Sequence, residues 1–549
     1  MKKILSILGV VLMLGMNSCV QNLNVESIDP NSKSTIDMNE LFVKCYATLA
    51  LTGQKGPDGN GDVAGVDEGT SSFYRMMFAL NEYCSDQIYW IWPDVGVDDI
   101  RKATWTASNT LIKGVYSRFY FDITLCNLFI DKFAEEAGAR RTAEVRFIRA
   151  LNYYYLLDMF GNVPKVWKSG LQELPEQYKR ADLYADLVAE IEDLMNDLAP
   201  AGQRESYYRV DQAAAWLLLS RICLNAEIYT GKDAAACKAD YDKAAEYADK
   251  VIGSTYDLAT EYRYLFMGDN DNLSAVNDAY KEIILPVGQD GVETQSWGGS
   301  LFLIASCYTS GMPASGTTEA WKCIRTRAQL IQLFCPELDR PKTAKSDDQA
   351  KEVYGKYYGG AAEITAAAKD SRAMFINRGT GDYVCNFWTQ NKDDEFLSGW
   401  GVVKYSNLMA DPARNSHDTK FPDTDLALMR KAEAYLNYAE AVLRGGAQKT
   451  MTPDAAINAV RHRAGAEEKS GYTLDDVLNE RGREFYAEGC RRSDLIRFHK
   501  FTGKAYAWEW KGGAILGAQA NVEDFRILYP LPLAEVTANT NLKQNEGYN

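Results

Sequence analysis

The sequence has few of the residues and motifs on which metal, redox or nucleotide chemistry depends. Only three of its 549 residues are histidines, His417, His462 and His499, and they lie far apart with no spacing typical of a zinc site. It has no C-x-x-C pair, P-loop, G-x-S-x-G motif or Rossmann glycine pattern. The sequence therefore predicts no metal and no cofactor, and it excludes the enzyme classes that these motifs define. Bound calcium at "DGNGDVAGVDEG" is the open alternative, although Val63 stands where the turn of a calcium loop needs glycine.

Positive charge and long apolar runs are scarce as well. Lys and Arg number 60 against 75 Asp and Glu, which gives a formal net charge of −15. This balance argues against nucleic acid as a ligand, and against docking on anionic lipid headgroups without a covalent anchor. Beyond residue 18 no segment has the ~20 apolar residues of a membrane-spanning helix, and the mean hydropathy of −0.32 is typical of a soluble body.

The first 19 residues have the three parts of an export signal. Lys2 and Lys3 precede the apolar run 4–16, and Asn17–Ser18 lead directly to Cys19. A cysteine at this point resembles the lipobox of bacterial lipoproteins, in which the cysteine becomes the lipid-bearing first residue. We therefore predict a signal peptide at 1–18, a lipid anchor on Cys19 and a polar tether at 19–38. A plain secretory signal with a chance cysteine is the alternative.

Ten cysteines remain after Cys19. Several of them, such as Cys45, Cys126 and Cys223, lie in apolar helical patterns, where a free cysteine behaves as a small hydrophobe. We expect mostly buried thiols, while a disulfide among Cys307, Cys323 and Cys335 stays open at this point.

Three segments predict similar helix pairs. In the stretches "AEVRFIRALNYYYLLDMFGNVP", "DQAAAWLLLSRICLNAEIYTG" and "LALMRKAEAYLNYAEAVLRGG" the helical pattern ends at glycine, and a second helical pattern follows each of them. Helix–turn–helix units of this length, rich in Ala, Leu and Tyr, are typical of tetratricopeptide-like repeats. We predict a mainly α-helical domain over 39–549, with this scaffold at about 140–255 and 425–490.

Two intervals have the opposite composition. Residues 53–110 and 255–420 are rich in Gly, Asp, Ser and aromatics, with short strand-like pieces such as "EIILPV" and "GVVKYS". Loops held on a rigid frame are where binding residues concentrate, so we expect these intervals to face a ligand.

Aromatic residues gather in both of these intervals. Sugar rings have apolar C–H faces and polar edges, so their binding sites combine Trp or Tyr faces with polar groups. The stacking candidates are Tyr89, Trp90, Trp92, Trp297, Tyr308 and Trp321, and the polar candidates are Asp94, Asp98 and Asp99. The alternative is that these rings pack the loops against the helical frame, which we expect for Trp105.

The densest charge pattern lies in "TLDDVLNERGREFYAEGCRRSDLIRFHK". Paired carboxylates there could be an acid/base couple, but i,i+3 and i,i+4 ion pairing on a helix face is the simpler explanation. We therefore predict a structural ion network, formed by Glu480, Arg481, Glu484, Glu488 and Arg491.

These motifs together resemble the SusD/RagB-like lipoproteins. The resemblance rests on the charged residues at 480–492, on "SDLIRF", on the closing stretch "YPLPLAEVTANTNLKQNEGY" and on the central helices quoted above. It implies the SusD-like fold, with four tetratricopeptide-like helix pairs, irregular ligand-facing loops and a few short strands. The acidic run that often follows the lipidated cysteine in this family is absent, because nothing acidic precedes Glu26.

The resemblance also implies a function. Such proteins are outer-membrane lipoproteins that capture nutrients, usually oligosaccharides, and act as a lid on a SusC-like TonB-dependent transporter without catalysis. We expect this function here, at the cell surface. One alternative is a peptide ligand. The other is a glycoside hydrolase with carboxylates such as Glu82 and Asp86 near the aromatic loop.

Overall fold

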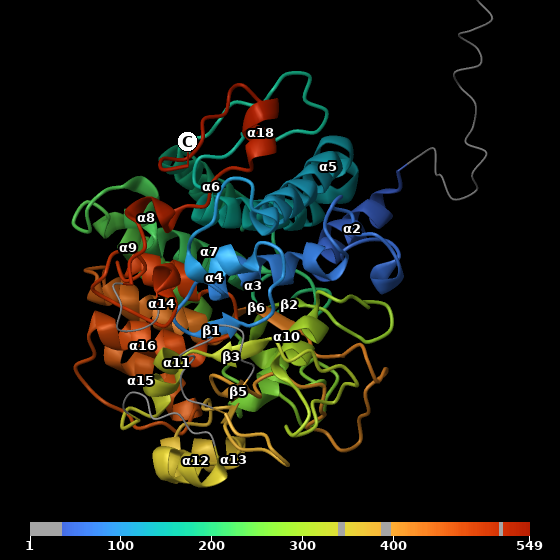
Figure 1. The fold of residues 1–549 in the computed structure, drawn as a ribbon. Helices are drawn as coiled ribbons and strands as arrows, with labels where there is room; N and C mark the ends of the chain where they lie inside the picture. Colours follow the sequence, from blue (N-terminus) through green and yellow to red (C-terminus); the bar gives the residue numbers. More distant parts are fainter. Residues whose placement is uncertain (1–35, 339–345, 386–396, 515–519, 549) are drawn as a thin grey trace, which may run out of the picture.

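The computed structural model describes residues 36–338, 346–385, 397–514 and 520–548. Helices dominate it, and three two-stranded antiparallel sheets lie among the loops (Figure 1). The longer helices are α2 (Met38–Ala50), α3 (Phe73–Glu82), α5 (Thr110–Met159), α6 (Arg180–Leu194), α7 (Gln212–Leu224), α9 (Lys238–Ile252), α14 (Lys431–Leu443), α15 (Pro453–Arg463) and α16 (Leu474–Glu484). The shorter ones are α4 (Val97–Lys102), α8 (Ala226–Thr230), α10 (Ser300–Cys307), α11 (Ala328–Phe334), α12 (Asp347–Tyr354), α13 (Ala361–Ala368), α17 (Arg491–Arg497) and α18 (Leu533–Ala538).

The predicted helix pairs form the scaffold. Helix α5 packs on α6, α7 packs on α9, and α14 packs on α15, while α9 also contacts α14 and so joins neighbouring pairs. The ends follow the sequence signals, because Gly231 takes the left-handed conformation after α8 and Thr452 caps α15 ahead of Pro453. The predicted mainly α-helical architecture with a few short strands is confirmed.

Helix α5 doubles back at Gly138, where φ is +75°. Helix α2 packs against α5, and Cys45 on α2 and Cys126 on α5 lie in the same small apolar cluster. This cluster also contains Phe129, which precedes Gly138, and Ile148, which follows it. The first described helix is therefore fixed by apolar packing on both arms of α5.

The interval 255–420 holds more regular structure than its composition indicates. Its described residues contain the short helices α10 to α13 besides four of the six described strands. Helix α10, "SLFLIASC", is buried on every side, so it has no polar face to mark it as a helix. Strand β1 (Ile88–Trp90) pairs with β3 (Ile324–Thr326), β2 (Ile283–Val287) with β6 (Leu426–Arg430), and β4 (Phe375–Ile376) with β5 (Gly401–Val402).

All ten cysteines within the described ranges carry free thiols, and nine of them are buried. The expectation of buried thiols is confirmed, and the three candidate disulfide cysteines, Cys307, Cys323 and Cys335, are free. Among the described helices, none combines the length and the apolar character that a membrane span requires.

Candidate functional site

A cleft of about 880 Å³ lies where segments far apart in the sequence meet. Its walls come from the loop 65–70, helix α3, the stretch between β1 and α4, the start of α5, and two tryptophans of the 255–420 interval. Four tryptophans line it, namely Trp90, Trp92, Trp297 and Trp321. The structure thus joins the two aromatic groups that the sequence places more than 200 residues apart.

Trp90 belongs to the floor of this cleft. Strand β1 holds it against Phe302, whose ring centroid is 5.7 Å away in a stacked arrangement, and against Tyr83 at 5.2 Å. Its indole N–H donates to Asp94 Oδ2 at 3.0 Å, and only 2% of the residue is exposed. Trp90 is therefore mainly a core residue that presents an edge to the cleft.

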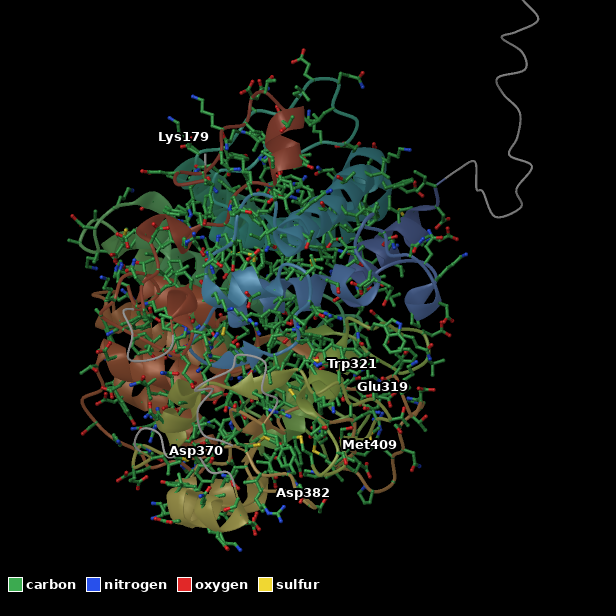
Figure 2. The ribbon with its side chains drawn as sticks, in the orientation of Figure 1. Lys179, Glu319, Trp321, Asp370, Asp382 and Met409 are labelled. Atoms are coloured by element: carbon green, nitrogen blue, oxygen red, sulfur yellow. The ribbon has the colours of Figure 1, made fainter. Side chains whose placement is uncertain are left out.

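Trp297 and Trp321 form an angled pair, with ring centroids 6.2 Å apart and planes at 40°. Trp321 and Glu319 lie close together (Figure 2). The indole N–H of Trp321 donates to Glu319 Oε2 at 2.9 Å, and that of Trp297 donates to the Pro57 carbonyl oxygen at 3.3 Å. Because their polar atoms already have partners, these rings offer mainly their faces to a ligand, and little conformational freedom is lost on binding.

Trp92 differs from the other three. It is 44% exposed and lies two residues after the end of β1, beside Pro93. Its ring is thus the most accessible of the four tryptophan rings, and it suits contact with a solvated ligand better than it suits packing.

The polar part of the cleft contains Asp94, Asp67 and Arg75. Arg75 lies on α3 with its guanidinium 4.9 Å from the Phe302 ring centroid, and it makes no side-chain hydrogen bond or ion pair with a described residue. A guanidinium has five N–H donors, so those of Arg75 are open to a ligand. Arg75 was not among the predicted site residues, because it is the one cation in an otherwise mostly apolar helix. That isolated cation was the signal that could have indicated it.

The structure corrects four of the predicted ligand contacts. Tyr89 is completely buried between the guanidinium groups of Arg101 and Arg327, and Tyr308 is 5% exposed and does not line the cleft. Alternation along β1 explains Tyr89, because its side chain points to the opposite face from that of Trp90. Asp98 pairs with Arg101 and Lys102 on α4, and Asp99 accepts from the Asn109 side chain, so neither carboxylate turns to the cleft.

The carboxylates considered for hydrolysis are also enclosed. Glu82 Oε1 accepts the backbone N–H groups of Gly489 and Cys490, and burial raises the pKa of Glu82 to about 8. Burial alone would raise the pKa of Asp86 too, but its ion pair with Arg491 at 2.7 Å holds that pKa below the ordinary value. Neither residue lines the cleft, so this pair of carboxylates cannot reach a ligand there.

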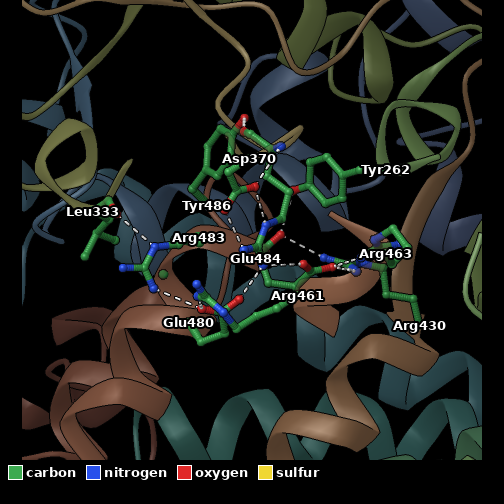
Figure 3. Close-up of polar contacts among 12 residues, drawn as sticks. Tyr262, Leu333, Asp370, Arg430, Arg461, Arg463, Glu480, Arg483, Glu484 and Tyr486 are labelled. Carbon is green, nitrogen blue, oxygen red and sulfur yellow. Dashed lines mark hydrogen bonds and ion pairs between the residues drawn. The ribbon is translucent and has the colours of Figure 1, made fainter. Parts of the chain in front are cut away.

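The charged residues of 480–491 lie in a buried network rather than on a helix face (Figure 3). Glu484 contacts three arginines from other segments, with Arg372 at 3.0 Å, Arg430 at 2.5 Å and Arg463 also bonded. Glu480 pairs with Arg372 and Arg461 besides its helix neighbour Arg483.

The other members of the predicted network also pair with residues outside their own helix. Arg481 pairs with Asp494, Arg491 with Asp86, and Glu488 with Arg430 and Lys404. The expectation of ion pairs mostly within one helix is therefore wrong, because nearly all partners come from distant segments.

The predicted anchor, Cys19, lies outside the described residues.

Comparison with known families decides where this chain belongs. A family model described as the SusD family matches residues 281–548, and one described as starch-binding associating with outer membrane matches residues 23–224. The starch-binding protein SusD of Bacteroides thetaiotaomicron is 39% identical over 98% of this chain and 97% of its own length. The chain belongs to the SusD family. A SusD-like protein of Bacteroides ovatus is 24% identical over 72% of the chain.

Solved structures share the fold of this SusD family member. The surface glycan-binding protein A of B. thetaiotaomicron, in complex with laminarihexaose, superposes with a TM-score of 0.63, at 20% identity over 92% of this chain and 98% of its own. A laminarin-binding SusD-like protein gives a TM-score of 0.64 at 18% identity over 94% of this chain and all of its own. At these identities the likeness supports the fold alone.

Proposed function

We propose that the cleft binds an oligosaccharide without cleaving it. The observation that carries the proposal is that four tryptophans, three of them fixed through their indole N–H groups, line one cleft together with Arg75, whose guanidinium has no hydrogen-bond partner among the described residues. Apolar ring faces beside a few polar groups suit the C–H faces and hydroxyl edges of a pyranose. The names of the relatives, which include starch-binding and laminarin-binding proteins, agree with this proposal.

An α-linked glucan is the first ligand to test, because the relative that matches the chain over almost its whole length is a starch-binding protein. We expect titration calorimetry with maltoheptaose to give a dissociation constant on the order of 10 μM to 1 mM, since an open cleft buries little of a hydrated sugar. Laminarihexaose and a cationic peptide complete the panel. Trp321→Ala should abolish most of the heat of maltoheptaose binding, because it removes one ring of the angled pair.

Two results would contradict this proposal. Heat with the peptide alone would favour the peptide-binding alternative, to which the acidic charge balance is suited. Release of new reducing ends from any glycan of the panel would favour the hydrolase. The enclosed positions of Glu82 and Asp86 speak against that outcome.

We further propose that a lipid on Cys19 holds the protein at the outer membrane, facing outward, and that it passes its ligand to a SusC-like TonB-dependent transporter. Tethering raises the concentration of captured glycan near the pore, which is the contribution that binding without catalysis can make to uptake. Cys19→Ala is expected to move the protein from the membrane fraction to the soluble fraction of the cells. A variant that still sediments with membranes would contradict the anchor, and co-purification with a transporter tests the partner.

A further inference from the structure

The turn at residues 417–423 packs behind the two angled tryptophans of the cleft. Asp418 Oδ1 accepts the backbone N–H groups of Lys420 and Phe421, at 2.7 and 2.8 Å, and so shapes the turn. The Thr419 carbonyl oxygen accepts the N–H of Thr318 at 2.8 Å, in the segment that leads to Trp321. The turn is thereby fixed to one of the two segments that carry the cleft rings.

The same turn contacts the segment that carries Trp297. Gly291 lies against the carbonyl oxygen of Phe421, which a Cβ at this glycine would approach to 2.8 Å. The Phe421 ring meets the Trp297 ring at 63° with centroids 5.6 Å apart, and it joins Leu301 and Ala305 in a buried cluster against which both tryptophans pack. The turn thus touches both sides of the angled pair.

Lys420 makes the shortest of these ring contacts. Its Nζ lies 3.9 Å from the centroid of Trp297, and Phe421 is the next ring at 5.3 Å. The ammonium has no hydrogen bond or ion pair with any described residue, although 75 acidic residues are present in the chain. Lys420 and Phe421 do not line the cleft, whereas Trp297 does, so the ammonium contacts the indole from outside the cleft.

We propose that Lys420 is a positioning residue of the cleft, which holds Trp297 at its angle to Trp321 by a cation–π contact on the face away from the ligand. The proposal rests on the glycan-binding function proposed above. An ammonium over an indole is attracted by the negative face of the ring, and a contact of this kind at a partly exposed site contributes modestly but directionally. The other contacts of the Trp297 ring are the hydrogen bond from its indole N–H to the Pro57 carbonyl oxygen and apolar packing against the Phe421 cluster, so Lys420 supplies the charged contact.

The test compares Lys420→Met with Lys420→Arg. Methionine keeps an unbranched apolar chain and removes the charge, while arginine keeps a cation that stacks on indole. Lys250→Met is the matched control, because Lys250 on α9 also places its Nζ over a ring, that of Tyr247, at 4.8 Å. Two measurements are made on each protein: glycan affinity by calorimetry, and the ¹⁹F resonance of Trp297 in 5-fluorotryptophan-labelled protein, assigned with Trp297→Phe.

We expect Lys420→Met to weaken maltoheptaose binding about threefold to tenfold and to shift the Trp297 resonance without ligand. Lys420→Arg should restore both, and Lys250→Met should change neither. A Lys420→Met protein with an unmoved resonance, or with a moved resonance and unchanged affinity, would overturn the proposal. If the wild-type protein binds no glycan, the proposed function is wrong, and so is the inference that Lys420 serves ligand binding. The ¹⁹F resonance of Trp297 then still shows whether Lys420 contacts the ring.

Discussion

Trp92→Ala is expected to weaken glycan binding at least tenfold while leaving the melting temperature almost unchanged. The ring is 44% exposed in the cleft, so its removal deletes a stacking face without opening a cavity in the core. A surface substitution of this kind changes the free energy of unfolding by about 0.5 kcal/mol or less, whereas a tenfold loss of affinity corresponds to about 1.4 kcal/mol. Calorimetry and thermal unfolding measure the two effects separately.

Trp90→Ala is the matched comparison, because it removes the same side chain two residues earlier in the chain. Here the ring packs on Phe302 and Tyr83 and is 2% exposed, so its loss should cost about 3–5 kcal/mol of unfolding free energy. Equal losses of stability in both variants would show that Trp92 is a packing residue as well. Unchanged affinity in a folded Trp92→Ala protein would remove this ring from the site.

The helical scaffold could be predicted because its signals are local. A capping residue such as Thr452, a proline at the next position and a glycine such as Gly231 each act on the few residues around them. The apolar spacing of 3.6 residues then shows which face is buried. Such features depend on one segment at a time, so one sequence is enough to read them.

The aromatic site was only partly predictable, because burial depends on partners that lie far along the chain. Tyr89, Trp90 and Trp92 are all aromatic residues of one short segment, but they have different environments. Tyr89 lies in the core between two arginines, Trp90 forms the floor of the cleft, and Trp92 is exposed. The pairing of β1 with β3, more than 230 residues later, decides this difference. The sequence gives no local sign of that pairing.

The partners within the charged network were mispredicted for a related reason. The spacing of Glu480, Arg481 and Glu484 fits ion pairing along a helix, but Arg372, Arg430 and Arg463 arrive from other elements and surround the carboxylates. Within a buried site the number of partners outweighs the helical spacing, because every desolvated charge needs compensation. The candidate residues were correct as members of a network, and their partners were not foreseeable.

Removing one carboxylate from this network is expected to have the largest effect on stability. Glu484→Gln leaves Arg372, Arg430 and Arg463 close together in a region where the glutamate side chain is fully buried, so about 3–5 kcal/mol of unfolding free energy should be lost at pH 7. Urea denaturation measures the loss. Glu468→Gln is the control, because Glu468 pairs with the exposed His462 and its removal should change stability by no more than about 0.5 kcal/mol.

The pH dependence of the difference in unfolding free energy between the wild-type protein and Glu484→Gln gives a second, independent check. Burial would raise the pKa of Glu484, but Arg463, Arg430 and Arg372 together hold that pKa far below its ordinary value. A carboxylate with a depressed pKa in the folded state contributes stability above its unfolded pKa of about 4.3, and loses that contribution as the pH falls below it. The gap between the wild-type protein and Glu484→Gln should therefore be widest near neutral pH and narrow below about pH 4. A gap that stays constant from pH 7 to pH 3 would mean that lost packing, and not the ionised carboxylate among three arginines, accounts for the effect.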